Sequence, residues 1–132
     1  MKNAPIPSNE KARLCAVFDL KILDTAFEKR FDDITKEATK KFRVPISTIT
    51  IIDKDREWYK SVQGLNIREG NRNVSFCGHA LLQEEILIIE DTRNNPDFAN
   101  NPMVIRLENP IRFYAGKSIY DRATNLQSAS SV

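Results

Sequence analysis

The sequence predicts an α+β fold. Two adjacent patterns support this class. Apolar residues recur at spacings of three and four between residues 27 and 42, which is typical of a helix with one packed face. Residues 46–53 are rich in β-branched side chains and predict a buried strand, and residues 58–62 follow a polar turn as the second arm of a hairpin. A helix followed by a hairpin favours an α+β domain.

The chain begins with an arm and a first helix. Residues 1–7 contain two prolines and lack the apolar core of a signal peptide, so we expect a cytoplasmic protein. A partial helix start signal follows, and Leu14, Val17 and Phe18 then share one face of a helix that ends near residue 20.

The second helix gives the stronger signal. Its apolar residues are expected to form a packed face and its charged residues a solvated one, and Pro45 closes the helix. The expected packed residues are Phe27, Phe31, Ile34, Ala38 and Phe42.

Four further segments complete the expected order. Residues 64–73 are polar and predict a loop across one end of the sheet, whereas residues 85–91 predict a short buried strand. Residues 111–116 alternate as another strand. Residues 121–132 are small and polar, which predicts a frayed tail.

Length and composition indicate one globular domain. The chain has 132 residues, 29% of them charged and 41% hydrophobic, and no apolar run is long enough to cross a bilayer. The 20 lysines and arginines are scattered among 18 acidic residues, which argues against a nucleic-acid binder. The two cysteines, Cys15 and Cys77, are expected to stay reduced.

Residues 73–83 hold the densest group of reactive side chains. Ser75 is a good N-cap for a short helix that begins at Phe76, and Cys77 then lies in the first turn, where the helix dipole favours a thiolate or a bound anion. The alternative is that Cys77 belongs to a buried helix face. A zinc site is the weakest interpretation, because Cys77 and His79 supply only half of the ligands that a structural site needs.

Asp91 and Arg93 stand at the end of the strand predicted for residues 85–91. Strand ends are common places for ligands, so the carboxylate and the guanidinium are candidate binding groups. The alternative is a solvated surface ion pair that contributes little to stability.

Many short motifs in this chain occur in the order found in GAF domains of bacterial signalling proteins. The sequence resembles this family over residues 8–119, which is nearly the whole chain. The matching motifs are Asn9-Glu10, Arg13-Leu14, Ile22-Leu23-Asp24-Thr25, Phe27, Phe31-Asp32, Pro45-Ile46, residues 53–56, Trp58, Lys60-Ser61, Gly64-Leu65, Val74-Ser75-Phe76-Cys77, His79-Ala80, Asp91-Thr92, Pro96, Phe98-Ala99, Asn101-Pro102, Val104 and residues 111–116.

The resemblance implies an antiparallel sheet with helices on both sides, as in the related profilin-like and PAS folds. It also implies a small-molecule cavity roofed by loops and a short helix, and a sensory role upstream of histidine kinases or cyclic-dinucleotide enzymes. After residue 116 the chain departs from the pattern, because relatives continue with another central strand and a final helix. The expected organisation is therefore an arm (1–7), a GAF domain (8–120) without its last strand and helix, and a polar tail (121–132).

The leading functional hypothesis is a non-enzymatic sensory module that binds a small molecule and requires no cofactor. It fits a chain with one histidine, no evident catalytic set and no phosphate-binding glycine loop. Family position and strand ends indicate aromatic walls with a few polar groups as the ligand site. The expected ligand-binding residues are Trp58, Tyr59, Phe76, Cys77, His79, Asp91, Arg93 and Tyr114.

Three other functions stay open. A ligand-free interaction module would form a homodimer through the N-terminal helix or an uncovered sheet edge. A thiol-based methionine sulfoxide reductase, an activity of some GAF relatives, would need a resolving thiol near Cys77, and Cys15 is expected to be too distant. A bilin photosensor would attach its pigment to Cys77, but the chain lacks the adjacent Cys-His pair of the cyanobacterial type.

Overall fold

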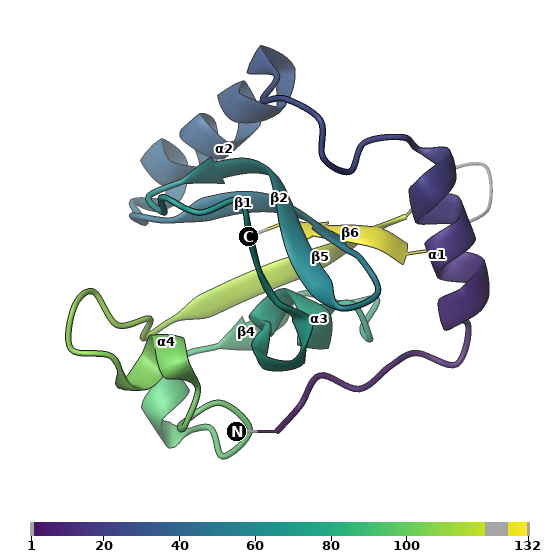
Figure 1. Cartoon of the computed structure of the whole chain (residues 1–132). Coiled ribbons are helices and arrows are strands. Elements are labelled where there is room, and N and C mark those ends of the chain that lie inside the picture. Colours follow the sequence, from purple (N-terminus) through teal and green to yellow (C-terminus); the bar gives the residue numbers. More distant parts are fainter. Residues whose placement is uncertain (1, 121–126, 132) are drawn as a thin grey trace.

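The computed structural model describes residues 2–120 and 127–131, which form a single sheet with helices on both faces (Figure 1). The sheet has six strands in the order β3-β2-β1-β6-β5-β4, and all neighbouring strands are antiparallel. Helices α1 and α2 pack on one face and helix α3 on the other. The predicted α+β class is therefore confirmed.

The bounds of the elements are as follows. The helices are α1 (Glu10–Asp19), α2 (Lys29–Phe42), α3 (Phe76–Ala80) and α4 (Pro102–Ile105), with two short 3₁₀ helices, η1 (Arg72–Val74) and η2 (Thr92–Asn94). The strands are β1 (Ser47–Ile52), β2 (Arg56–Gln63), β3 (Glu69–Asn71), β4 (Leu87–Ile89), β5 (Tyr114–Tyr120) and β6 (Gln127–Ser131).

The predicted hairpin is present. Strands β1 and β2 pair in an antiparallel register, and the turn between them closes with a 2.9 Å hydrogen bond from the Asp53 N–H to the Arg56 carbonyl. All residues of β1 are buried, as its β-branched composition indicated. The two faces of β1 separate the core into two clusters, one around Ile51 and the other around Ile52.

The apolar face of α2 is not the face that packs. Phe27, Ile34 and Phe42 are 52%, 56% and 67% exposed, whereas Thr35 is buried and its hydroxyl lies 2.8 Å from the Ser61 hydroxyl. The prediction of a packed apolar face was therefore wrong. The reason lies beneath the helix, where the surface of β2 is polar and hydrogen-bonds a threonine better than it packs a phenylalanine.

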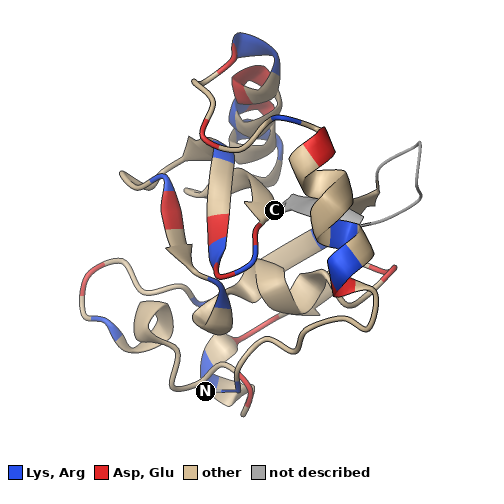
Figure 2. Ribbon diagram, turned by 45° about the vertical axis from the view of Figure 1, so that its right-hand side comes forward, with Lys and Arg blue, Asp and Glu red and all other residues tan. Residues whose placement is uncertain are grey.

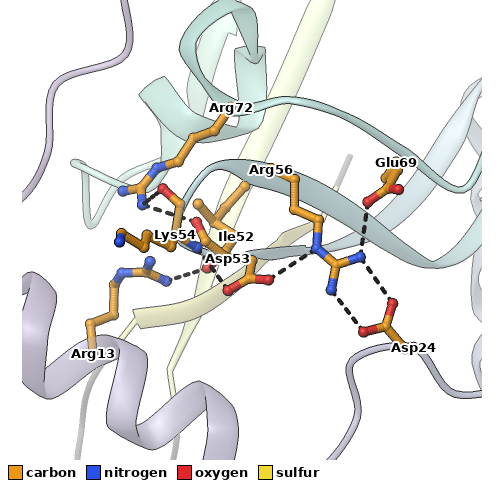
Figure 3. A network of polar contacts seen from close by, with 8 residues as sticks. All are labelled: Arg13, Asp24, Ile52, Asp53, Lys54, Arg56, Glu69 and Arg72. Atoms are coloured by element: carbon orange, nitrogen blue, oxygen red, sulfur yellow. Dashed lines mark hydrogen bonds and ion pairs between the residues drawn. The ribbon is translucent and has the colours of Figure 1, made fainter.

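Helix α1 is also rotated from the expected orientation, because Val17 is buried but Phe18 is 53% exposed. The sheet instead receives Arg13, which is fully buried and donates a 2.7 Å hydrogen bond to the Ile52 carbonyl (Figure 3). Arg72 binds the same hairpin through the carbonyls of Asp53 and Lys54.

The carboxylate of Glu10 joins these two arginines. Its oxygens accept hydrogen bonds from Arg13 and from Arg72, so α1 is fixed to the β1–β2 turn by one acid between two buried cations. A separate cluster on the outer side of the turn links Arg56 to Asp24, Asp53 and Glu69 (Figure 3).

Three predicted segments have different limits in the structure. The expected loop 64–73 contains β3 and the start of η1, and the expected strand 85–91 shortens to β4, with Ile88 57% exposed. The strand expected at 111–116 begins only at Tyr114 and continues to Tyr120. Residues 111 and 112 are held elsewhere, because the carbonyls of both accept hydrogen bonds from Thr92.

The polar tail also differs from the expectation. Residues 127–131 form β6, which lies between β1 and β5, so this part is a central strand and not a frayed end. Pairing with a strand on each side supplies backbone hydrogen bonds that composition does not indicate. The other residues of the expected tail, 121–126 and 132, lie outside the described residues.

Charge and hydropathy of the described helices give two further facts. Basic and acidic residues are interspersed over the helices and loops (Figure 2). None of the helices in residues 2–120 or 127–131 combines the length and the apolar character needed to cross a bilayer.

Candidate functional site

The short helix α3 lies against the face of the sheet opposite α1 and α2, and it begins as the sequence predicted. The Ser75 hydroxyl caps it by accepting a 3.0 Å hydrogen bond from the Gly78 N–H. All five residues of α3 are buried, and the helix packs on β5, β6 and β1. The side chains between α3 and the sheet are the candidate site.

The centre of this site is the buried carboxyl group of Glu57, which is 8% exposed. One of its oxygens accepts a 2.7 Å hydrogen bond from the Tyr59 hydroxyl, and the other accepts from the Ser75 hydroxyl. Burial raises the pKa of Glu57, and hydrogen bonds from Ser75, Tyr59 and Cys77 oppose this rise only in part. The same burial, together with the nearby carboxylate, raises the pKa of Tyr59.

Cys77 lies beside the Glu57 group and contacts strands β1 and β5. Its Sγ atom is 3.7 Å from the Thr50 hydroxyl oxygen and 3.5 Å from the Tyr114 hydroxyl oxygen. The Phe76 ring stacks on Tyr114 at a centroid distance of 5.1 Å and on Phe98 at 4.9 Å. The site therefore combines polar groups with three aromatic walls.

Tyr114 occupies the space between β5 and α3. A Cβ atom placed on Gly116 would lie 2.1 Å from the Tyr114 hydroxyl oxygen, so the phenol ring folds back along its own strand over the glycine. Gly116 is required because any side chain there would displace the ring. Tyr114 thus covers β5 at Gly116.

Four of the eight predicted site residues converge here. Tyr59, Phe76, Cys77 and Tyr114 are all buried and belong to the hydrogen-bonded and stacked group beneath α3.

The other four lie elsewhere. Trp58 faces the opposite side of the sheet, where it packs with Val17, and His79 lies on the outer side of α3 with its Nε2 3.1 Å from the Lys2 carbonyl oxygen. Asp91 and Arg93 form an ion pair of 2.7 Å at the surface, with the arginine side chain 63% exposed. The eight residues therefore do not line one common cavity.

The central residue of the site, Glu57, was missed at the sequence level. It follows the polar turn of residues 53–56, and the predicted second arm of the hairpin began only at residue 58. The available signal was strand parity, because Glu57 and Tyr59 are two residues apart on β2 and must point to the same face.

The two cysteines lie on different helices, and the histidine shares a helix only with Cys77. Among the described residues, no three histidine, cysteine, aspartate or glutamate side chains are grouped to hold a metal ion. Cys15 is exposed on α1, whereas Cys77 is buried under α3. Their helices pack on opposite faces of the sheet, α1 beside Ile51 and α3 beside Ile52.

Comparison with protein-family profiles gave no match. The chain is 37% identical to a cyclic di-GMP phosphodiesterase of Pseudomonas aeruginosa over 116 aligned residues, and these residues make up 88% of this chain. It spans only 20% of the length of that protein.

Solved structures decide the fold. A GAF domain from A. aeolicus, crystallised in an inactive state, superposes with a TM-score of 0.58 at 21% identity, over 92% of this chain and 78% of that one. The chain has the GAF fold. The free methionine-R-sulfoxide reductase of Neisseria meningitidis, solved with its substrate, has the same fold, with a TM-score of 0.59 at 14% identity over 99% of this chain and 78% of the reductase.

Proposed function

We propose that this GAF domain is a non-enzymatic regulatory module that binds a small planar molecule beneath α3 and relays its presence to an output domain. The observation that carries the proposal is the buried group of Glu57, Tyr59 and Ser75. Hydrogen-bonding side chains inside an apolar compartment cost free energy to bury, and they are the groups that orient ligands in small-molecule sites.

Tyr114 supports this interpretation, because its ring occupies space beside Phe76 that a ligand could take. If the phenol rotates away from Gly116, a flat molecule can stack on Phe76 and place its hydrogen-bonding edge against Glu57. Burial raises the pKa of Glu57 and so shifts its carboxyl group toward the form that can donate as well as accept, which suits a heteroaromatic edge of mixed character.

The output is proposed from the relative. Since the Pseudomonas protein is named a cyclic di-GMP phosphodiesterase, a cyclic-dinucleotide enzyme is favoured over a histidine kinase as the partner domain. We further propose that the module acts in the cytoplasm. The reductase activity of the Neisseria protein is not extended to this chain, because Cys15 and Cys77 lie on opposite faces of the sheet.

A thermal-shift screen tests the proposal. The panel contains cyclic nucleotides, cyclic di-GMP, heme, bilins, amino acids and aromatic acids, and a ligand of the folded state raises the melting temperature by mass action. Glu57→Gln and Tyr59→Phe should reduce the shift, whereas Asp33→Asn, a change on the solvated side of α2, should not. If no compound raises the melting temperature of the unmodified protein, ligand binding at this site is refuted.

The second candidate is an interaction module, which the exposed apolar side chains of α2 favour. A homodimer would bury Phe27, Ile34 and Phe42, with Phe18 on α1 as a further contact. Sedimentation should then show a dimer that Ile34→Ser and Phe42→Ser convert to a monomer. A protein that sediments as a monomer at every concentration removes this candidate.

A further inference from the structure

The N-terminal arm is docked on the outer side of α3. The Lys2 N–H donates to the Asp97 carbonyl and the Ala4 N–H to the Asn73 carbonyl, each at 3.1 Å. Ala4 is buried, and a Cβ atom on Gly78 would lie only 2.9 Å from the Ala4 methyl carbon. The arm therefore packs directly on the helix and forms a wall.

A pocket of about 230 Å³ lies beside this wall. This pocket is separate from the Glu57 group. Phe98 is the one residue described above for the Glu57 site that also lines the pocket. Leu82, Leu87 and Phe98 provide apolar surface, and the remaining lining residues are Lys2, Pro5, His79, Gln83, Asn95 and Asp97. The volume is below the usual range of drug-sized sites, so the pocket suits a ligand of about ten heavy atoms and excludes a dinucleotide.

Two opposite charges line the pocket. Lys2 and Asp97 both act on the imidazole of His79, and within residues 2–120 and 127–131 neither forms an ion pair. Burial lowers the pKa of His79, which favours the neutral ring. Because a carbonyl can only accept, Nε2 carries the proton toward Lys2, and Nδ1 is left as an acceptor.

We propose that this pocket binds a free α-amino acid with an apolar side chain. The ammonium group binds Asp97 and the acceptor nitrogen of His79, and the carboxylate binds Lys2. The side chain of the ligand packs against Leu82, Leu87 and Phe98. A ligand with only one of the two charges makes only one of these ion pairs, so it should bind more weakly than a free amino acid.

Calorimetric titration with L-leucine, L-methionine and L-phenylalanine tests the proposal. Two analogues of leucine, each lacking one of its charged groups, probe the two charges separately. Isoamylamine lacks the carboxylate and 4-methylpentanoate lacks the ammonium group, so each should bind at least tenfold more weakly than L-leucine. If none of the three amino acids binds, or if either analogue binds as tightly as L-leucine, the proposal is overturned.

Variants locate the site. Asp97→Asn should weaken amino-acid binding at least tenfold, while Asp33→Asn, which makes the same charge change on α2, leaves it unchanged. Glu57→Gln should also leave it unchanged, because Glu57 lies on the other side of α3. Melting curves of each variant serve as the control for folding. Loss of binding in Glu57→Gln, or wild-type binding in Asp97→Asn, would place the ligand elsewhere and contradict the assignment.

Discussion

Glu10→Gln tests how strongly the first helix is fixed to the sheet. The Glu10 carboxylate accepts hydrogen bonds from Arg13 and Arg72, which are 0% and 3% exposed. Burial alone would raise the pKa of Glu10, but the hydrogen bonds from the two arginines outweigh it and lower the pKa from 4.5 to about 2. Glutamine keeps the size of the side chain and removes the charge that compensates both guanidinium groups.

The expected magnitude follows from this pKa. A drop from 4.5 to about 2 corresponds to about 3.4 kcal/mol, and partial exposure of the carboxylate reduces the expected loss to about 2 kcal/mol at pH 7. A lowered pKa means that the native state holds the proton less tightly than the unfolded chain. The contribution is therefore complete above about pH 4.5 and disappears as the pH falls toward 2.

Urea unfolding followed by tryptophan fluorescence is the assay. Trp58 is the only tryptophan, and it packs against Val17 of α1, so its emission reports the detachment of this helix. Asp33→Asn is the control, because Asp33 pairs with Lys29 at an exposed site and should cost less than about 0.5 kcal/mol. If the two variants lose the same stability, or the Glu10→Gln deficit persists unchanged at pH 2, the reasoning is refuted.

Three further predictions concern the site and the exposed face of α2. The raised pKa of Glu57 means that the native state binds the proton of this carboxyl group more tightly than the unfolded chain, so wild-type stability should fall as the pH rises above the ordinary glutamate pKa. Urea midpoints measured between pH 4 and 8 should therefore vary less with pH in Glu57→Gln. An identical pH dependence in the two proteins argues against a buried acid. Gly116→Ala should lower the melting temperature by an amount equivalent to about 1–3 kcal/mol, and Tyr114→Ala should abolish that cost; an unchanged melting temperature for Gly116→Ala alone is the contrary result. Ile34→Ser should change the free energy of unfolding by less than about 0.5 kcal/mol in urea titrations of a monomeric sample, whereas a loss of about 2 kcal/mol or more would mean that this residue is packed.

The features that the sequence predicted correctly depend on neighbours in the chain. The hairpin and the Ser75 cap are local, so β-branched composition and a capping hydroxyl were enough to predict them. The orientation of α2 was not predictable from its own pattern, because it is set by polar groups of β2. Lys60 is fully buried there, held by Glu28 and by the carbonyl of Ala26, and this makes the interface polar.

The candidate site was predicted in part for a similar reason. The family resemblance indicated aromatic residues that lie beneath α3, but it grouped Trp58 with Tyr59, and these neighbours on β2 point to opposite faces of the sheet. Strand β6 was not predicted, because pairing between distant strands is non-local and leaves no periodicity in a short polar segment.

The place of β6 has a consequence for biosynthesis. Strands β3, β2 and β1 form one part of the sheet and β5 and β4 another, and β6 is the strand that hydrogen-bonds to both. It is also the last of the six to emerge from the ribosome, so a nascent chain carries two unfinished ribbons with open edges until residues 127–131 have been translated. Until then those edges are open to chaperones and to other nascent chains, and the emergence of β6 allows the two ribbons to pair into one sheet.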